Sequence, residues 1–358
     1  MASGGGPTTR GQELPGLLGS ARSLTGGSTI RWGIALLALG VALVVAGGSL
    51  RVAQVVILTE SLQFALFACA TNLLVGYGGL VSFGQGAFYG TGAYVIGLTA
   101  LHLQLNFWVA FIAAPFVAAG VALAVGLIAV RTSGLYFALL TLAFAQLLNT
   151  IALLQNKLTN GSTGIFGHLL PAFLTNPRNA FLFVLVITAA ALGALWWITI
   201  SPFGLTLQAI RENRDRAEAL GVNVFRHQLL AFVLSGFFCG IAGALFVVYD
   251  NAAYPALLNW VYSGYPVFMA VIGGMFSFLG PALGAFIYTA AYTIINNHTG
   301  DWQLIFGAVL LVVALFMPDG LVGIVRRRGG PSAGRTLAGW LRLPGARRRQ
   351  AAEEPVRR

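Results

Sequence analysis

Charged residues are scarce in this sequence, and that scarcity excludes most soluble folds. Only 9% of the 358 residues are Asp, Glu, Lys or Arg, whereas 57% are hydrophobic and the mean hydropathy is +0.81. A typical soluble domain has about 25% charged residues. Several apolar runs also reach the roughly 20 residues that a helix needs to cross a bilayer. The composition therefore predicts an all-α, polytopic integral membrane protein.

Lysine and the common catalytic motifs are nearly absent. The single lysine, Lys157, follows Asn156, so the chain has no G-x-x-x-x-G-K-[ST] loop for the phosphates of ATP. The hydrophobic segments contain no G-x-S-x-G or H-E-x-x-H motif, which argues against an intramembrane enzyme. The apolar interior also lacks the spaced acidic and basic residues that an ion-driven carrier needs, which argues against a secondary carrier.

Cysteine and histidine are too few and too scattered to predict a metal site. Cys69 and Cys239 both fall in apolar segments, and no two of the four histidines have the spacing of metal ligands. We therefore expect two buried free thiols, no disulfide framework and no metal.

Ten hydrophobic segments are candidates for membrane-spanning helices. They are Ile30–Gly48, Ala53–Val75, Leu80–Leu101, Phe107–Val130, Leu135–Leu154, Ala180–Thr199, Leu229–Tyr249, Val261–Phe278, Pro281–Asn296 and Trp302–Pro318. The third and eighth are rich in glycine, and we expect them to be broken. Residues 1–29 lack the apolar core of a signal peptide and are expected to be a disordered leader. Residues 30–325 then form the transmembrane domain, and 326–358 form a basic tail.

The basic residues indicate which side faces the cytoplasm. Ten spans place both termini on one side, and if that side is inside, only Arg51, Lys157 and Arg178 of the 21 basic residues lie outside. Cytoplasmic loops carry an excess of Lys and Arg, so this orientation is favoured. It puts residues 201–227 in the cytoplasm and the loop 155–179 outside. The tail, with ten basic residues, is expected to contact anionic lipid and not nucleic acid.

One cytoplasmic insert, residues 201–227, concentrates the charge of the transmembrane domain. It holds four arginines and three acids in 27 residues. Strong helix formers run from Leu205 to Leu220, and Gly221 stands where a left-handed residue would end a helix. We therefore expect one continuous helix. Two pairs at i,i+4 spacing would stabilise it, Glu212–Arg216 and Arg214–Glu218.

The insert also carries a narrow apolar stripe. The stripe consists of Leu207, Ile210, Ala217 and Leu220. Such a stripe fits a groove on a partner protein. A helix that only shields its own loop explains the same pattern, and the residues alone do not separate the two interpretations.

Three blocks of the sequence resemble one family. FGLTLQAIRENRDRAEALGVNVFRHQLLAFVLSGFFCGIAGAL (203–245) is similar to a cytoplasmic loop and the following span of bacterial ABC permeases for branched-chain amino acids, of the LivM type. NLLVGYGGLVSFGQGAFYGTGAYVIGL (72–98) resembles a Gly-rich signature of that family. VIGGMFSFLGPALGAFI (271–287) and IFGAVLLVVALFMPDGLVG (305–323) resemble its C-terminal half.

The resemblance implies a function and a set of partners. The chain would be one permease subunit of an ABC importer in a bacterial inner membrane, with both termini in the cytoplasm. Its partners would be a LivH-like permease forming a heterodimer, two ABC ATPases that bind ATP and Mg, and a periplasmic substrate-binding protein; this chain itself would bind no cofactor. The insert would be the coupling helix that rests on an ATPase. Its coupling residues would be Ile210, Arg211, Glu212, Asn213, Arg216, Ala217, Leu220 and Gly221.

The Gly-rich block 76–97 is the candidate path for a solute. Non-helical backbone at membrane depth is tolerated where it is buried in protein or lines a watery cavity, and its free N–H and C=O groups can meet the charged ends of an amino acid. We therefore name Ser82, Gly84, Gln85 and Tyr94 as path residues. Glu60 is the one acid well inside a span; it either lines the path or forms a hydrogen bond between helices.

The substrate stays open at this point. Many relatives carry an acidic residue where this sequence has Tyr265. Branched-chain amino acids, urea, short amides and aromatic acids all remain candidates. A secondary carrier or channel and a structural membrane protein that uses the basic tail are the alternatives from other classes.

Small residues four apart predict close contact between helices. The motifs are Gly86-x-x-x-Gly90, Gly236-x-x-x-Gly240 and Gly280-x-x-x-Gly284. Because lipid provides no hydrophobic drive for helix association, such motifs let two backbones approach closely. For the second and third motifs we expect a packing role and no other.

Overall fold

The structure is a computed structural model that describes residues 52–103, 106–167, 169–298, 307 and 320. The expected spans at 30–48 and 302–318 (apart from residue 307), the leader and the basic tail lie outside the described residues. The described helices are α2 (Val52–Asn72), the π-helix η1 (Leu73–Tyr77), α3 (Gln85–Leu98), the π-helix η2 (Thr99–Leu103), α4 (Phe107–Ala129), α5 (Leu135–Leu154), α6 (Asn156–Thr159), the 3-10 helix η3 (Ala172–Thr175), α7 (Pro177–Ile200), α8 (Pro202–Glu212), α9 (Arg214–Ala219), α10 (Val224–Asp250), the 3-10 helix η4 (Pro255–Leu258), α11 (Trp260–Gly273) and α12 (Gly280–His298).

The chain is an all-α membrane protein, as predicted. Among the described residues, five helical segments are long and apolar enough to cross a bilayer: α2 with η1, α4, α5, α7 and α10. The apolar helices α3 and α11 have 14 residues each. At 1.5 Å per residue each is about 21 Å long, shorter than the roughly 30 Å hydrocarbon core.

The two expected breaks are confirmed. Residues 78–84, here called link 1, are non-helical and delay the start of α3 to Gln85. Residues 274–279, called link 2, follow the end of α11, and Gly274 has a φ of 113° that a residue with a side chain rarely adopts. Glycine therefore stands just before the start of α3 and just after the end of α11, where the chain changes direction.

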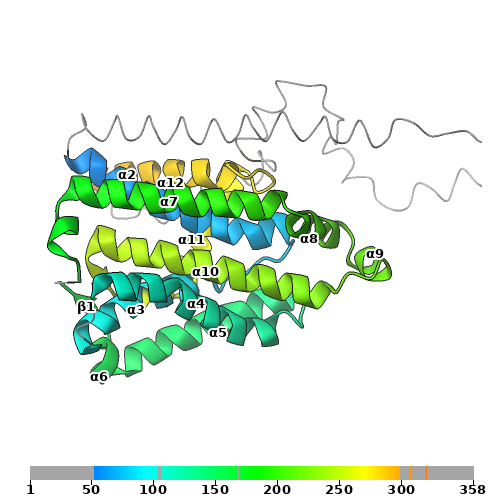
Figure 1. The fold of residues 1–358 in the computed structure, drawn as a ribbon, viewed down its shortest axis with the longest axis horizontal. Helices are drawn as coiled ribbons and strands as arrows, with labels where there is room; N and C mark the ends of the chain where they lie inside the picture. Colours follow the sequence, from blue (N-terminus) through cyan, green and yellow to red (C-terminus); the bar gives the residue numbers. More distant parts are fainter. Residues whose placement is uncertain (1–51, 104–105, 168, 299–306, 308–319, 321–358) are drawn as a thin grey trace, which may run out of the picture.

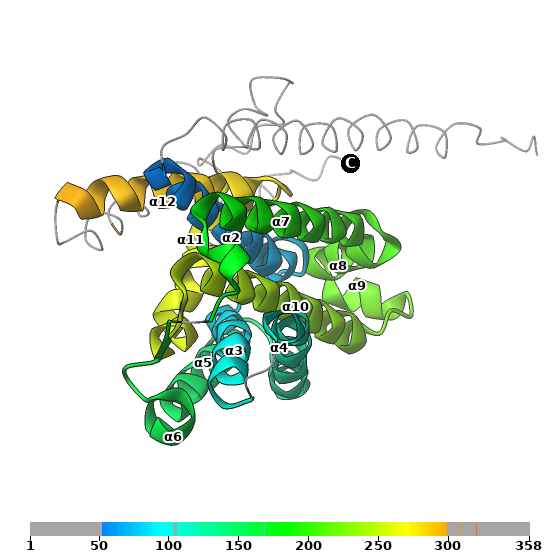
Figure 2. The same cartoon turned by 60° about the vertical axis from the view of Figure 1, so that its left-hand side comes forward.

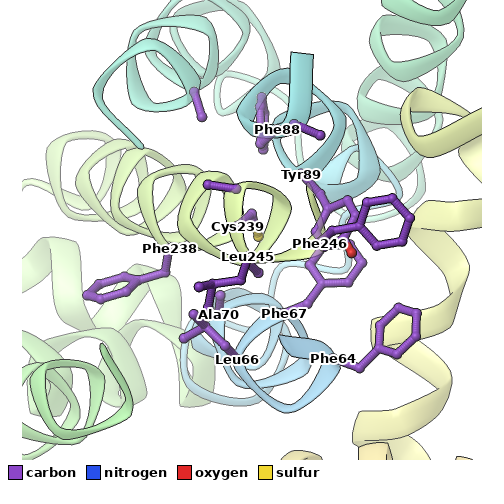
Figure 3. Packing of buried hydrophobic residues seen from close by; sticks show 14 of the residues in the cluster. Phe64, Leu66, Phe67, Ala70, Phe88, Tyr89, Phe238, Cys239, Leu245 and Phe246 are labelled. Atoms are coloured by element: carbon purple, nitrogen blue, oxygen red, sulfur yellow. The ribbon is translucent and has the colours of Figure 1, made fainter. Parts of the chain in front are cut away.

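Helix α10 is the centre of the bundle. It packs against α4, α3 and α2, and Figure 1 shows it between α3, α4 and α5 on one side and α2, α7 and α12 on the other. The turned view keeps this order (Figure 2). Its aromatic and aliphatic side chains meet those of α2 and α3 in one core that includes Phe67, Tyr89, Phe238 and Phe246 (Figure 3).

The small-residue motifs hold the helices together, as expected. A Cβ on Gly236 would lie 2.4 Å from the Cβ of Ala122, and one on Gly240 would lie 2.5 Å from the Cβ of Ala118. Both alanines belong to α4, so these glycines set the α10–α4 contact. A Cβ on Gly284 would lie 1.9 Å from the carbonyl oxygen of Met269 in α11. Each glycine is required because a neighbouring helix occupies the space of a side chain.

The loop 155–179 is largely irregular, as predicted, but it is tied to a second loop. Its short strand β1 (Ile165–Phe166) pairs antiparallel with β2 (Ala252–Ala253). The rings of Phe166 and Tyr254 stack with centroids 6.2 Å apart. Figure 1 shows α6 and β1 at the end of the bundle opposite α8 and α9. The insert and this loop therefore lie at opposite ends of the helix bundle.

Candidate functional site

The insert consists of two helices and not one. Helix α8 begins after Ser201, whose Oγ accepts a hydrogen bond from the Gly204 amide at 3.5 Å, and Pro202 occupies its first turn. Asn213 is extended, with φ −160° and ψ 104°, and its Oδ1 accepts a hydrogen bond from the Arg216 amide at 2.8 Å. The expected continuous helix from Leu205 to Leu220 is therefore wrong, because Asn213 ends α8 and caps α9.

The break changes which ion pairs form. Arg214 and Glu218 lie on α9 together, and Arg214 Nε is 3.1 Å from Glu218 Oε1. The expected Glu212–Arg216 pair would cross the break, and the described structure does not form it. The side chains of Arg214 and Glu218 are 44% and 51% exposed, so their pair contributes only a few tenths of a kcal/mol.

Most of the apolar stripe attaches the insert to its own membrane domain. Leu207 is buried in the main core, and Ile210 and Ala217 form a small cluster with Val224 at the start of α10. Leu220 is 80% exposed. In this structure the stripe is therefore not free to enter a groove on a partner, apart from Leu220.

The remaining surface of the insert is exposed and mostly polar, with Leu205 and Leu220 as its exposed large apolar residues. Of the predicted coupling residues, the exposed ones are Glu212, Asn213, Arg216, Leu220 and Gly221. Arg211 is half-buried: its Nη1 donates a hydrogen bond to the carbonyl oxygen of Gly76, and its guanidinium lies 5.3 Å from the centroid of the Phe276 ring. The predicted set thus divides into anchoring side chains, an exposed face and one inward-pointing arginine.

Link 2 meets the end of the α2–η1 span beside the insert. A Cβ on Gly76, at the end of η1, would lie 2.2 Å from the carbonyl oxygen of Met275. Asn72 Nδ2 donates a hydrogen bond to the carbonyl oxygen of Ser277 at 3.5 Å. The Cys69 thiol lies 3.7 Å from the carbonyl oxygen of Phe278. Helix α8 packs against η1, α7 and α10. The insert therefore packs on the end of the α2–η1 span, where that span contacts link 2.

The candidate path residues on link 1 and α3 are packed inside the protein. Gln85 is fully buried, and its Oε1 accepts hydrogen bonds from Ser235 Oγ at 3.1 Å and from Cys239 Sγ at 3.3 Å. Ser82 Oγ accepts from the Gly84 amide at 3.2 Å. The structure brings Ser82, Gly84 and Gln85 together.

Tyr94 lies further along α3 and is also buried. Its hydroxyl and the Nε2 atom of Gln85 have no hydrogen-bond partner among the described residues. A buried polar atom without a partner costs about 1–3 kcal/mol. Such atoms therefore mark positions where a polar group from water or a solute would be stabilising. Ser235 and Cys239 had no distinguishing sequence signal, because they reach Gln85 from a distant helix.

Glu60 lies on α2, nearer the end of this helix that is farther from the insert. It is partly buried on α2, beside Asp250, and accepts a hydrogen bond from the Tyr249 hydroxyl on α10. This is the contact between helices that the sequence analysis left open as an alternative. A cavity of about 210 Å³ lies next to it, lined by residues that include Thr59, Leu174 and Tyr249.

Comparison with known proteins identifies relatives of this chain. A family model described as "Branched-chain amino acid transport system / permease component" matches residues 53–315. The chain is 25% identical over 327 residues to the high-affinity branched-chain amino acid transport system permease protein LivM of Salmonella typhimurium, covering 84% of this chain and 77% of LivM.

More distant relatives match smaller parts. A probable branched-chain amino acid transport permease protein LivH from Methanocaldococcus jannaschii is 24% identical over 274 residues, covering 68% of this chain and 83% of LivH. The xylose transport system permease protein XylH of Escherichia coli K12 is 29% identical over 146 residues, covering 37% of this chain and 36% of XylH. No solved structure matches significantly.

Proposed function

This chain belongs to the branched-chain amino acid transport permease family, and we propose that it forms, together with a second, LivH-like permease, the path by which branched-chain or related amino acids enter a bacterial cell. Its relatives include both LivM and LivH proteins. Two similar subunits can surround a path on the axis between them, as in other paired assemblies. The heterodimer is thus the assembly that this family likeness favours.

The energy for transport comes from separate ATPase subunits. The chain has no phosphate-binding loop because its one lysine follows Asn156. ATP and Mg are therefore bound by two partner ATPases on the cytoplasmic side, and this chain contributes neither ligands nor a nucleophile for hydrolysis.

The observation that carries this proposal is the attachment of the insert. Leu207 is buried in the main core, and Ile210 and Ala217 are buried against Val224 at the start of α10, so α8 and α9 are docked on their own chain and not loosely tethered. The exposed side chains of Glu212, Arg216 and Leu220 are then available to an ATPase. Movement of that ATPase would pass through α8 to η1, α7 and α10, which it contacts.

Solute passes beside the Gly-rich region in this proposal. Ser82, Gly84, Gln85 and Tyr94 would line the path when the closed packing of α3 against α10 opens, and the unpartnered atoms of Gln85 and Tyr94 would then meet water or solute. The cavity beside Glu60 is lined in part by Leu170 and Leu174 of the loop 155–179, which this proposal places on the outer face, where a solute would enter.

The outer face is suited to a periplasmic receptor. The loop 155–179 contains Lys157 and Arg178 and no acid, and its β1–β2 pairing gives it a defined shape. A receptor with an acidic rim would be attracted to this surface. Because the receptor chooses the solute, urea, short amides and aromatic acids remain within the same mechanism.

Reconstitution into vesicles tests the proposal. The chain, its LivH-like partner and the two ATPases are expected to take up labelled leucine only with ATP, Mg and loaded receptor on the appropriate sides. The chain alone is expected to move no solute down a gradient. Gradient-driven flux through the chain alone would instead make it a self-sufficient carrier or channel.

A further inference from the structure

We infer that Arg211 is the positioning residue that carries movement of the insert to both links, an inference that rests on the proposed function. Arg211 is the only arginine of the insert whose guanidinium contacts two other segments of the membrane domain in the described structure. The other three, Arg214, Arg216 and Arg226, are exposed. Arg211 therefore faces its own chain and not an ATPase.

The first contact is at the end of η1. The last carbonyl groups of a helix have no partner within the helix, and they carry partial negative charge. The carbonyls of Leu73 and Leu74 accept hydrogen bonds from Gly78 and Leu80 in link 1. The carbonyl of Gly76 accepts one from Arg211 Nη1. Arg211 thus completes the C-terminal cap of the α2–η1 span.

The stem of Arg211 lies on link 1 itself. Gly79 has a φ of 68°, and a Cβ there would lie 2.7 Å from Arg211 Cγ and 3.5 Å from Arg211 Cα. Glycine is required at this position both for the backbone conformation and for the approach of α8. Link 1, which leads into the candidate path residues of α3, is therefore in direct contact with the backbone of α8.

The second contact is with link 2. The guanidinium lies 5.3 Å from the centroid of the Phe276 ring, within the range of a cation–π interaction. The adjacent residue Met275 presents its carbonyl to Gly76. Arg211 therefore covers the seam at which η1 and link 2 touch, and a shift of α8 moves both sides of that seam together.

The chemistry favours arginine specifically. A planar guanidinium can donate to a carbonyl while its face lies on an aromatic ring, whereas a lysine ammonium is a compact point charge. We therefore expect Arg211→Lys to keep part of the function and Arg211→Gln to lose most of it. Arg226→Gln is the matched control, because Arg226 is exposed at the start of α10 and outside the proposed docking face.

The test uses the full complex in vesicles and measures two quantities, solute taken up per ATP hydrolysed and the amount of ATPase retained on purification. For Arg211→Gln we expect uptake per ATP to fall at least tenfold with ATPase retention unchanged. Phe276→Leu is expected to lower it about threefold. The double variant is expected to be no worse than Arg211→Gln alone, because both changes remove the same contact.

Each other outcome overturns the inference. An uptake ratio for Arg211→Gln equal to that of Arg226→Gln excludes a transmitting role. Loss of bound ATPase would make Arg211 a docking residue instead. If Arg211→Gln does not insert stably, Phe276→Leu still tests the inference, because Phe276 is exposed and lies in link 2. An unchanged ratio of solute uptake to ATP hydrolysis in Phe276→Leu would exclude a role for the contact between Arg211 and Phe276. Failure of the unaltered complex to take up solute with ATP would refute the proposed function itself.

Discussion

Replacing Ile210 by alanine should release the insert from the membrane domain. Ile210 is 3% exposed, and its neighbours in the small cluster are Ala217, Val224 and the partly buried Val222. The change removes three carbon atoms, each worth about 0.8 kcal/mol when buried. With the cavity that remains, the loss of docking free energy is about 2.5 kcal/mol, at the lower end of the range for such substitutions. That is roughly 70-fold in the ratio of docked to released insert.

Hydrogen exchange measures this release directly. We expect the amides of α8 and α9 to exchange roughly 70-fold faster in Ile210→Ala, because local opening limits their exchange, while the amides of α4 keep their rates. Leu220→Ala is the control, because Leu220 is 80% exposed and its loss should change exchange by about twofold at most. If the amides of α8 and α9 keep their rates in Ile210→Ala, or if Leu220→Ala accelerates them equally, the anchoring argument fails.

Three further predictions test other parts of the structure. Asn213→Ala removes the cap of α9 at a cost of about 1 kcal/mol, so we expect fivefold to tenfold faster exchange in α9, whereas Asn213→Asp, which keeps an acceptor, should change little. Gly240→Ala places a methyl group about 2.5 Å from Ala118 and should lower the melting temperature, with Ala118→Gly restoring part of the loss; full stability of Gly240→Ala would contradict the close α10–α4 contact. Cysteines at Leu220 and Phe166 should react with an impermeant maleimide from inside and outside respectively, since both native cysteines are buried; labelling of both from one side would contradict the topology.

The sequence predicted the long helices well because their boundaries follow from composition. The run expected to span 135–154 is α5 residue for residue, and α4 ends one residue before its expected end. A long apolar run in a bilayer must satisfy its backbone groups internally, so helix is the only outcome open to it. The glycines of links 1 and 2 also predicted the breaks correctly, since positive φ at Gly79 and Gly274 is a local property of the residue type.

The break at Asn213 was not predicted because the signals on either side agree with a continuous helix. Helix formers flank Asn213, and i,i+4 charge spacing looks the same in one helix or two. The available signal was the preference of Asn for the position just before a helix, where its side chain competes with the backbone for hydrogen bonds. In the structure the Arg216 amide donates a hydrogen bond to Asn213 Oδ1, and burial of Ala217 beside Ile210 supplies the packing that holds α9 in place.

The sequence located the candidate site but could not assign a role to each of its residues, because those roles depend on contacts between distant parts of the chain. Ser82, Gln85 and the insert stood out as polar or charged residues in an apolar chain, but Gln85 meets Ser235 and Cys239 across 150 and 154 positions of sequence, and Arg211 meets Gly76 across 135. Four arginines with similar local surroundings gave no means of choosing the inward-pointing one.

One part of the insert surface packs on the membrane domain, and only the other part is left exposed to a partner. The three buried apolar residues are used to hold α8 and α9 on α10 and the main core, so the surface left for a partner is mostly polar. Polar contacts without a large apolar core favour an interface that can rearrange, because charged rim contacts contribute more to association rate and orientation than to affinity. A motor that must close and reopen in each cycle requires such an interface, together with a firmly attached element behind it. Under the proposed function, the burial of Ile210 and the exposure of Glu212 and Arg216 would provide this combination within one 27-residue segment.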